Sequence, residues 1–229
     1  MNIGTVEELQ KAVKENPELA QDVLKLRKAI SDSLYWMKNF TKTRDEQDPD
    51  HPYKPFPDRE YFKVLHDLAA REPILFVEKS RTMMASWWAV AEDLHYVMTH
   101  PPATAIFWAQ DERRALVLRD YAWTLWEQQH PALKHMFPVL RPKERQSYDR
   151  IQFASGGQCL ALPGKDPNVI RALHPARLLV DEACFIENGG EAFDVAISSR
   201  VPHVKVISSA APSWFRDLTR DAVPEALSC

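Results

Sequence analysis

Two adjacent acids, Asp181 and Glu182, directly follow the apolar run 178–180. The run is short and aliphatic, so it predicts a buried β-strand that ends in the two acids. Buried carboxylates need a compensating cation, and the carboxyl ends of parallel strands line the ligand crevice of open α/β sheets. We therefore expect Asp181 to hold Mg²⁺ and Glu182 to orient or deprotonate a water. The alternative is a solvated Asp-Glu pair that opens a surface loop.

Charged and hydroxyl side chains also gather in the segment 78–87. This segment follows the apolar run 74–77, which predicts a strand, and leads into 85–99, which lacks glycine and proline and predicts a buried helix. The first turn of a helix presents unpaired amides and the positive end of the helix dipole. The position therefore suits a phosphate group.

The usual phosphate-loop pattern G-x-x-x-x-G-K-[ST] is absent from this segment. Ser86 stands where the Mg²⁺-binding hydroxyl is expected, but Ala85 occupies the lysine position and Met84 the preceding glycine position. Positive charge lies instead at the beginning of the loop, on Lys79 and Arg81. The alternative is an ordinary strand-to-helix turn with stray basic residues.

Strand and helix patterns alternate along the rest of the chain, which predicts an α/β fold with a mostly parallel central sheet flanked by helices. Further strands are expected at 104–108 and 204–209, a further helix at 112–129, and a hairpin at 151–162. These elements position the two candidate segments.

The chain divides into three parts. Residues 1–39 form a helical leader, in which Pro17 begins a helix and apolar residues recur at three- and four-residue spacing over 19–37. The leader either packs on the main domain or docks a partner. Residues 40–58 are polar and proline-bearing, which predicts a linker, and 59–229 form the α/β domain.

Composition excludes several classes of protein. The chain of 229 residues has 29 basic and 32 acidic side chains, a net charge of −3, which excludes a histone-like basic DNA binder. No apolar run is long enough to cross a membrane. The 3 cysteines lack C-x-x-C spacing, which favours a reducing setting, and no histidine spacing indicates zinc.

In order along the chain, several segments resemble the ATPase domain of phage terminase large subunits, the motors that use ATP to package DNA. Residues 79–87, Lys-Ser-Arg-x-x-x-x-Ser-Trp after a strand, are similar to the family's deviant phosphate loop, its Walker A motif. Residues 178–183 resemble its Walker B motif, and 208–210 resemble its coupling motif. Two connecting segments, 151–163 and 170–172, resemble its strand-turn-strand and its Ile-Arg-Gly turn.

The resemblance, which covers residues 55–215, implies a P-loop NTPase fold of the ASCE type with ATP as substrate and Mg²⁺ as cofactor. It implies that Ser86 and Asp181 hold the metal and that Glu182 polarises the attacking water. The residues it places around the nucleotide form one continuous loop: Lys79, Ser80, Arg81, Thr82, Met83, Met84, Ala85, Ser86 and Trp87.

The resemblance also implies roles for two arginines and a coupling segment. Arg81 would contact the γ-phosphate within the subunit, and Arg171 would enter a neighbour's site as a finger; a structural ion pair is the equal alternative for Arg171. Ser208, Ser209 and Ala210 would sense the γ-phosphate and pass its loss to the DNA-gripping surface.

Two departures from the family pattern reduce backbone freedom, because Met84 and Ala172 replace glycines. If either position needs a positive φ, the loop binds nucleotide weakly. The family's glutamine motif is not evident, so Tyr53, Phe56 or Tyr61 are candidates to cover the adenine, with core packing as the alternative.

A basic stretch, 134–150, carries 5 basic and 2 acidic side chains. Such a patch holds DNA phosphates without reading sequence, and Lys143, Arg145 and Arg150 are the candidate contacts. The alternative is a solvated basic loop.

The partners that the resemblance implies are double-stranded DNA, a portal protein, a small terminase subunit and further copies of the chain in a pentameric ring. The chain would be monomeric in isolation and would act in the host cell cytoplasm. The family's nuclease domain is not expected after Ser213. Two alternatives stay open: a helicase-like ATPase on single strands, and an ATPase fold without turnover that serves as a docking module.

Overall fold

The structure, a computed structural model, describes most of the chain but not every residue expected to act. The described residues are 17–80, 82–141, 147–164, 168–187, 189–209, 211 and 213–221. The expectations for Arg81, Lys143, Arg145 and Ala210 lie outside these ranges. Within them, no helix is both long and apolar enough to span a bilayer.

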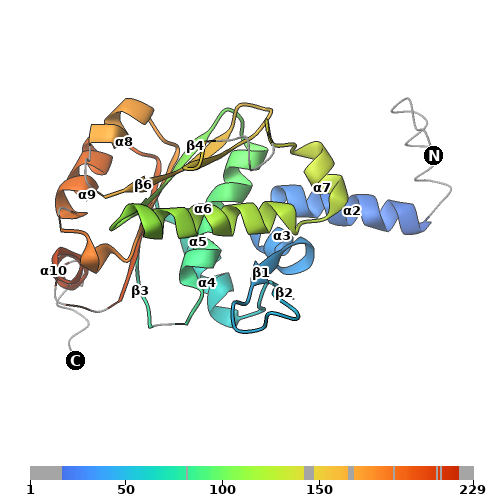
Figure 1. Cartoon of the computed structure of the whole chain (residues 1–229), viewed down its shortest axis with the longest axis horizontal. Helices are drawn as coiled ribbons and strands as arrows, with labels where there is room; N and C mark the ends of the chain where they lie inside the picture. Colours follow the sequence, from blue (N-terminus) through green and yellow to red (C-terminus); the bar gives the residue numbers. More distant parts are fainter. Residues whose placement is uncertain are drawn as a thin grey trace.

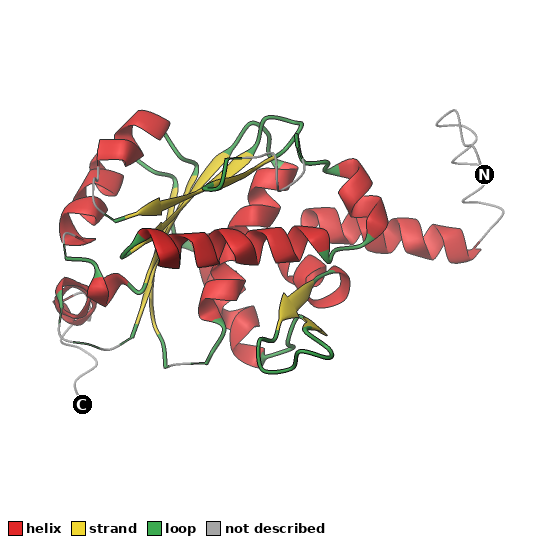
Figure 2. Cartoon of the chain, viewed as in Figure 1, coloured by secondary structure: helices red, strands yellow, loops and turns green. Residues whose placement is uncertain are grey.

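A six-stranded sheet forms the centre of the molecule (Figures 1 and 2). Its spatial order is β3-β8-β7-β4-β6-β5, and all neighbouring pairs are parallel except β5 with β6. The strands are β3 (Ile74–Glu78), β4 (Thr104–Ala109), β5 (Arg150–Gln152), β6 (Gln158–Pro163), β7 (Arg177–Asp181) and β8 (His203–Ser208). The mostly parallel α/β sheet expected from the alternating pattern is therefore confirmed.

Helices cover both faces of the sheet because the chain reverses direction across it. It moves outward from β3 to β4 to β6 through α5 (Ala85–Thr99), α6 (Glu112–Glu127) and α7 (Pro131–Met136). It returns to β7 and β8 through α8 (Asn168–Leu173), a short 3₁₀ turn η2 (Ala183–Phe185) and α9 (Gly189–Ser198), and ends in α10 (Trp214–Asp221). Right-handed crossovers place outward and returning helices on opposite faces. The two buried apolar clusters, one with α5 and α6 and one with α8 to α10, agree with this.

Helix α5 is the most buried helix that leads from a strand end. It contains no glycine or proline, and its buried residues lie all round the helix rather than on one stripe. The sheet covers one side, while α3 (Ser33–Phe40) and α6 lie against others. This packing holds the first turn of α5 in place beside the strand ends.

The leader packs on the domain through α3. The single apolar face expected over 19–37 is split, because Asp32 is extended (φ −137°) and its carboxylate accepts from the Tyr35 amide at 2.8 Å. Helix α2 (Pro17–Ser31) therefore ends there, and α3 turns Trp36 and Met37 into the core.

The segment expected as a linker, 40–58, contains an antiparallel hairpin of β1 (Lys42–Arg44) and β2 (Tyr53–Pro55). Lys54 closes it through ion pairs with Asp45 (2.5 Å) and Asp48 (3.2 Å). Phe56 then enters the core, 5.4 Å from the ring of Phe62 in α4 (Glu60–Arg71). Burial of Phe56 in the core anchors this proline-bearing segment to the domain.

Candidate active site

The carboxyl ends of three adjacent strands meet at one edge of the sheet. Glu78 of β3 pairs with Ser208 of β8, and Asp181 of β7 pairs with Ile207 of β8. The Lys79 amide donates to the Ser208 carbonyl at 2.9 Å. Because β8 lies between β3 and β7, the loops that follow β3 and β7 approach each other across its end.

The loop after β3 enters α5 through a left-handed residue. Met84 has φ 53° and ψ 24° and precedes the first helical residue, without a side-chain cap. Its carbonyl accepts the Trp88 amide at 3.1 Å. This is a conformation that glycine adopts without cost and other residues do not. The reduced freedom expected from the sequence is therefore a real strain at Met84, whereas Ala172 lies in α8 and has no positive φ.

Met84→Gly is expected to be more stable than Met84→Ala by about 1 kcal/mol, because both variants lose the same side chain and glycine alone relieves the left-handed backbone. Urea unfolding of the two purified variants measures this difference. Ala172→Gly is the matched control and should destabilise by about 0.5–1 kcal/mol, since it places glycine inside a helix. A Met84→Ala variant as stable as Met84→Gly would contradict the assignment of strain.

Lys79 and Glu182 form an ion pair at the site. Their Nζ and Oε1 atoms are 2.6 Å apart, with side-chain exposures of 10% and 29%. Glu182 itself is left-handed (φ 50°) and precedes η2. Non-glycine residues held in such conformations concentrate at active sites, where the surrounding structure enforces them. The turn therefore presents the Glu182 carboxylate to the loop that begins at Lys79.

Ser86 and Asp181 form the second contact between the same two loops. The Ser86 hydroxyl, in the first turn of α5, donates to Asp181 Oδ1 at 2.8 Å. Burial raises the pKa of Asp181 to about 6, although the Ser86 hydrogen bond and the charge of Lys79 act in the opposite direction. A buried carboxylate beside a hydroxyl, short of positive charge, fits a hard divalent cation such as Mg²⁺.

Asp181→Asn is expected to stabilise the nucleotide-free protein by up to about 3 kcal/mol above pH 6. The native state of the wild type binds more protons than the unfolded state between pH 3.8 and about 6. Its stability relative to Asp181→Asn should therefore fall as pH rises through that window and stay constant above it. Urea unfolding from pH 4 to 8 measures the gap, with exposed Asp194→Asn as control. A gap independent of pH would contradict the raised pKa.

Ser208 joins the two loops from between them. It is fully buried, and its hydroxyl accepts from the Cys184 amide at 2.9 Å while its carbonyl accepts from the Lys79 amide. Ser209, the next residue, lies 3.5 Å from the Cys184 sulfur through its hydroxyl. The segment expected to couple the site to the rest of the molecule thus touches both the loop after β3 and the turn that carries Glu182.

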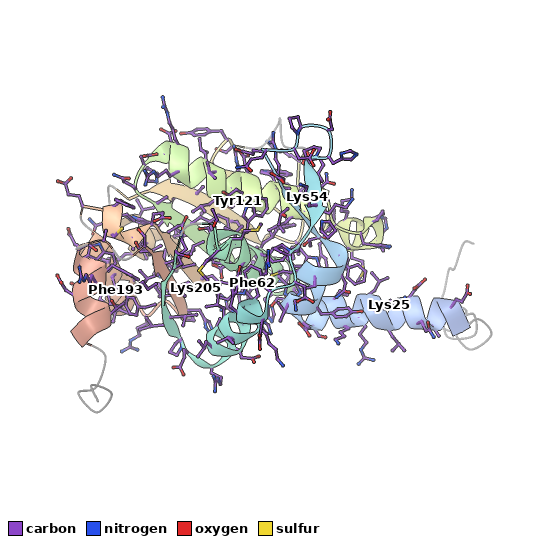
Figure 3. The ribbon with its side chains drawn as sticks, turned by 90° about the horizontal axis from the view of Figure 1, so that it is seen from below. Lys25, Lys54, Phe62, Tyr121, Phe193 and Lys205 are labelled. Atoms are coloured by element: carbon purple, nitrogen blue, oxygen red, sulfur yellow. The ribbon has the colours of Figure 1, made fainter. Side chains whose placement is uncertain are left out.

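Two tyrosines complete the site. The Tyr61 hydroxyl donates to the Met83 carbonyl at 2.8 Å, so this side chain holds the loop in place. Tyr121 of α6, labelled in Figure 3, stacks on Trp87 with 3.9 Å between the ring centres. No local pattern marks Tyr121 in the sequence, because its role depends on α6 packing beside α5.

A cleft of about 310 Å³ opens beside the two acids. Its lining combines apolar and aromatic side chains of β4, α6 and η2 with Arg114, the two acids and Ser209: Ala109, Arg114, Val117, Leu118, Tyr121, Asp181, Glu182, Phe185 and Ser209. A cleft with apolar walls and convergent polar groups is typical of a small-molecule site. In the described ranges no group of three or more His, Cys, Asp or Glu side chains could hold a metal ion.

Other residues predicted from the sequence do not line the cleft, and two of them, Arg171 and Arg150, were predicted to act elsewhere, in a neighbouring copy and on DNA. Arg171 is exposed on α8 and forms no ion pair with a described residue. Arg150 is paired with the neighbouring Asp149, 3.0 Å from Nε to Oδ1, which compensates its charge. Tyr53 is exposed on the hairpin, and Phe56 is buried in the core. Within the loop itself, the side chains of Ser80 and Thr82 are exposed and that of Met83 is half-buried.

No family model matches the sequence. The structure is similar to the HK97 bacteriophage large terminase, with TM-score 0.61 and 12% identity over 84% of this chain and 40% of that one. It is also similar to the Thermus phage P74-26 large terminase ATPase domain, with TM-score 0.54 and 14% identity over 76% of this chain and 75% of that one. The chain has the fold of a large-terminase ATPase domain.

A point mutant of the P74-26 terminase domain gives the same TM-score of 0.54, with 15% identity over 71% of this chain and 69% of that one. The resemblance to terminases read from the motifs is thus confirmed as a likeness of fold. The chain spans two fifths of the HK97 terminase that it matches. A segment is 38% identical over 71 residues to mouse unconventional myosin-Ia, but this covers 28% of the chain and 7% of the myosin and does not place the chain.

Proposed function

We propose that the chain is a terminase-type ATPase that binds Mg²⁺–ATP at the loop between β3 and α5 and couples hydrolysis to movement of double-stranded DNA. One observation carries the proposal: Ser86, in the first turn after the loop, is hydrogen-bonded to Asp181 across the intervening strand β8. This places a hydroxyl and a carboxylate together where the phosphates of a nucleotide would meet helix α5. The terminase-like fold supports the same assignment.

The chain's own residues then have separate roles. Lys79 binds the β- and γ-phosphates, and the loop amides up to Ser86 surround them. Ser86 and Asp181 hold the Mg²⁺ that enters with ATP and neutralises phosphate charge. Glu182 accepts a proton from the attacking water.

The Lys79–Glu182 ion pair bears on when Glu182 can act as a base. The ammonium group of Lys79 lies 2.6 Å from the carboxylate of Glu182. Phosphate oxygens would compete for the same ammonium group and would leave the Glu182 carboxylate free to accept a proton. We infer that competition for Lys79 links the availability of the base to the binding of ATP.

Coupling and DNA contact are part of the same proposal. Ser208 and Ser209 lie between the two loops, so loss of the γ-phosphate would alter their contacts with Lys79 and Cys184. The basic stretch 134–150 would hold DNA phosphates, with Arg171 serving a neighbouring copy in a ring. A portal protein and a small terminase subunit are the further partners proposed, in the cytoplasm of an infected cell.

Phosphate release by the purified chain tests the proposal, with Mg²⁺–ATP alone, with duplex DNA and with single-stranded DNA, over a range of protein concentrations. We expect turnover that rises with duplex DNA and with protein concentration. Lys79→Ala should weaken binding of a fluorescent ATP analogue, whereas Lys54→Ala, which removes a surface ion pair of the hairpin, should not.

Each contrary outcome would indicate a different function. Stimulation by single strands alone would indicate a helicase-like ATPase. Nucleotide binding without turnover at any concentration would indicate a docking module. Equal nucleotide binding by Lys79→Ala and the wild type would reject the site itself.

A further inference from the structure

A second cavity, of about 460 Å³, lies away from the candidate active site. It is formed where the leader helices and α4 meet α5 and the sheet, and its polar lining includes Ser33, His66, Glu92, His100, Arg177 and Lys205. Apolar walls come from Ile30, Ala69 and Ala70. The size and mixed lining suit a small molecule rather than a few waters.

The acids at this cavity already have partners. Glu92 accepts from Ser33 at 2.7 Å and pairs with His66 Nδ1 at 2.7 Å. The Glu92 hydrogen bond raises the pKa of His66; burial acts against ionisation of Glu92, but His66 brings the pKa of Glu92 below its usual value. Lys205 is bonded to buried Asp93. These two pairs are mutually compensated.

Arg177 is a charged residue at this cavity that lacks such a partner among the described residues. It begins β7, forms no ion pair with a described residue, and its Nε is buried without a hydrogen-bond partner. Its guanidinium lies 4.0 Å from the ring centre of Tyr96, which stacks in turn on His100 at 4.3 Å. His203 pairs with Arg177 in the sheet, and burial followed by the charge of Arg177 lowers the pKa of His203. An imidazole is neutral or positively charged, so His203 does not compensate the charge of Arg177.

We propose that this cavity binds a small molecule through a carboxylate or phosphate group held by Arg177. A planar guanidinium fixed by stacking on Tyr96 presents paired N–H donors in the geometry that these oxyanions accept. Arg177 Nε has no hydrogen-bond partner, and no described acid forms an ion pair with Arg177, so a negatively charged ligand with hydrogen-bond acceptors fits it. The apolar wall of Ile30, Ala69 and Ala70 accommodates the rest of the molecule.

The cavity is separate from the nucleotide site although both share two elements. Arg177 begins β7 and Asp181 ends it, so the two side chains lie about 13 Å apart along the strand, on the same face. Ser86 stands in the first turn of α5, and Tyr96 lies about 15 Å further along that helix. A ligand at Arg177 therefore does not need the phosphate loop.

Histidine-ring NMR signals test this inference, because His66 and His100 both line the cavity. Titration of the wild type with inorganic phosphate, and separately with acetate, at constant ionic strength should give saturable shifts of these signals. The anion that saturates at the lower concentration identifies the class of oxyanion. Arg177→Gln should weaken the apparent affinity about tenfold or more, since one charged hydrogen-bonding group is lost.

Two further variants separate this site from others. Ser86→Ala, which alters the phosphate loop, should leave the shifts unchanged, and Arg177→Lys, which keeps the charge but not the paired donors, should bind more weakly than the wild type. Shifts that persist in Arg177→Gln, that grow linearly without saturation, or that disappear in Ser86→Ala would overturn the proposal. Circular dichroism of both Arg177 variants confirms that a lost shift is not lost folding.

Discussion

Glu182→Gln is expected to lower the turnover number for ATP by about 10²–10⁴-fold, the contribution of a positioned general base. Glutamine keeps the size and the left-handed turn of this residue but cannot accept the proton of the attacking water. The same change removes the carboxylate that lies 2.6 Å from the Lys79 ammonium group and competes with phosphate for it. Affinity for ATP should therefore stay equal or increase while turnover is lost.

Phosphate release and binding of a fluorescent ATP analogue measure the two effects on one preparation. Glu187→Gln is the matched control, because Glu187 is an exposed acid just beyond η2 and should leave both quantities unchanged. A fall in affinity that matches the fall in turnover would mean that Glu182 binds nucleotide rather than activating water. Unchanged turnover would remove Glu182 from the catalytic assignment.

Asp93→Ala is expected to destabilise the protein by about 3–5 kcal/mol, the cost of leaving one partner of a buried ion pair uncompensated. Asp93 of α5 is fully buried, and Lys205 of β8 is 3% exposed and bonded to it. Figure 3 shows Lys205 deep in the molecule, in this view between Phe193 of α9 and Phe62 of α4. No described acid other than Asp93 pairs with the ammonium group of Lys205.

Urea unfolding measures the loss of stability in Asp93→Ala, and two further sets of variants serve as controls. Asp93→Leu combined with Lys205→Met should recover most of the stability, since apolar side chains of similar volume often replace a buried pair without loss. Asp22→Ala breaks the exposed pair of Lys25 and Asp22, which are 3.2 Å apart, and should change stability by less than about 1 kcal/mol. A small effect of Asp93→Ala would show that water or a local shift compensates Lys205.

The buried pair also bears on coupling in the proposed ATPase. Asp93 is on the helix that begins at the phosphate loop, and Lys205 is on the strand that ends at Ser208. The pair therefore ties the element that would bind phosphate to the element that would sense it. A stabilised Asp93→Leu and Lys205→Met variant with normal nucleotide binding allows this link to be examined without loss of folding.

Local pattern was sufficient for the parts of the site that lie close together in the sequence. Helix 85–99 has the predicted bounds, because its composition excludes breakers and its apolar residues permit burial on all sides. The acids at 181 and 182 end a strand as predicted, and Ser86 stands in the first helical turn. The replacement of a glycine by Met84 predicts weak nucleotide binding if that position has a positive φ, and the φ of Met84 is positive.

Other features were not predicted. The break at Asp32 has a local signal, because aspartate is a preferred N-cap residue and its carboxylate accepts from the Tyr35 amide. The apolar spacing continues unchanged on either side of it, however, and favours one helix. The hairpin within 40–58 depends on burial of Phe56 against α4, and the position of Tyr121 depends on α6 lying beside α5. From composition alone, the hairpin in 40–58 resembles a linker and Tyr121 resembles any other aromatic residue of the core.

The amino-acid sequence alone predicts the strands and helices around the candidate site and which of them end in acids, hydroxyls or cations, because these are short-range properties. Strand order and packing establish that β8 separates β3 from β7, that Lys79 meets Glu182, and that Ser86 meets Asp181. They also leave Arg177 at the second cavity without an ion pair to a described residue. Those contacts join residues far apart in the chain, so strand order and packing create them and no local pattern records them.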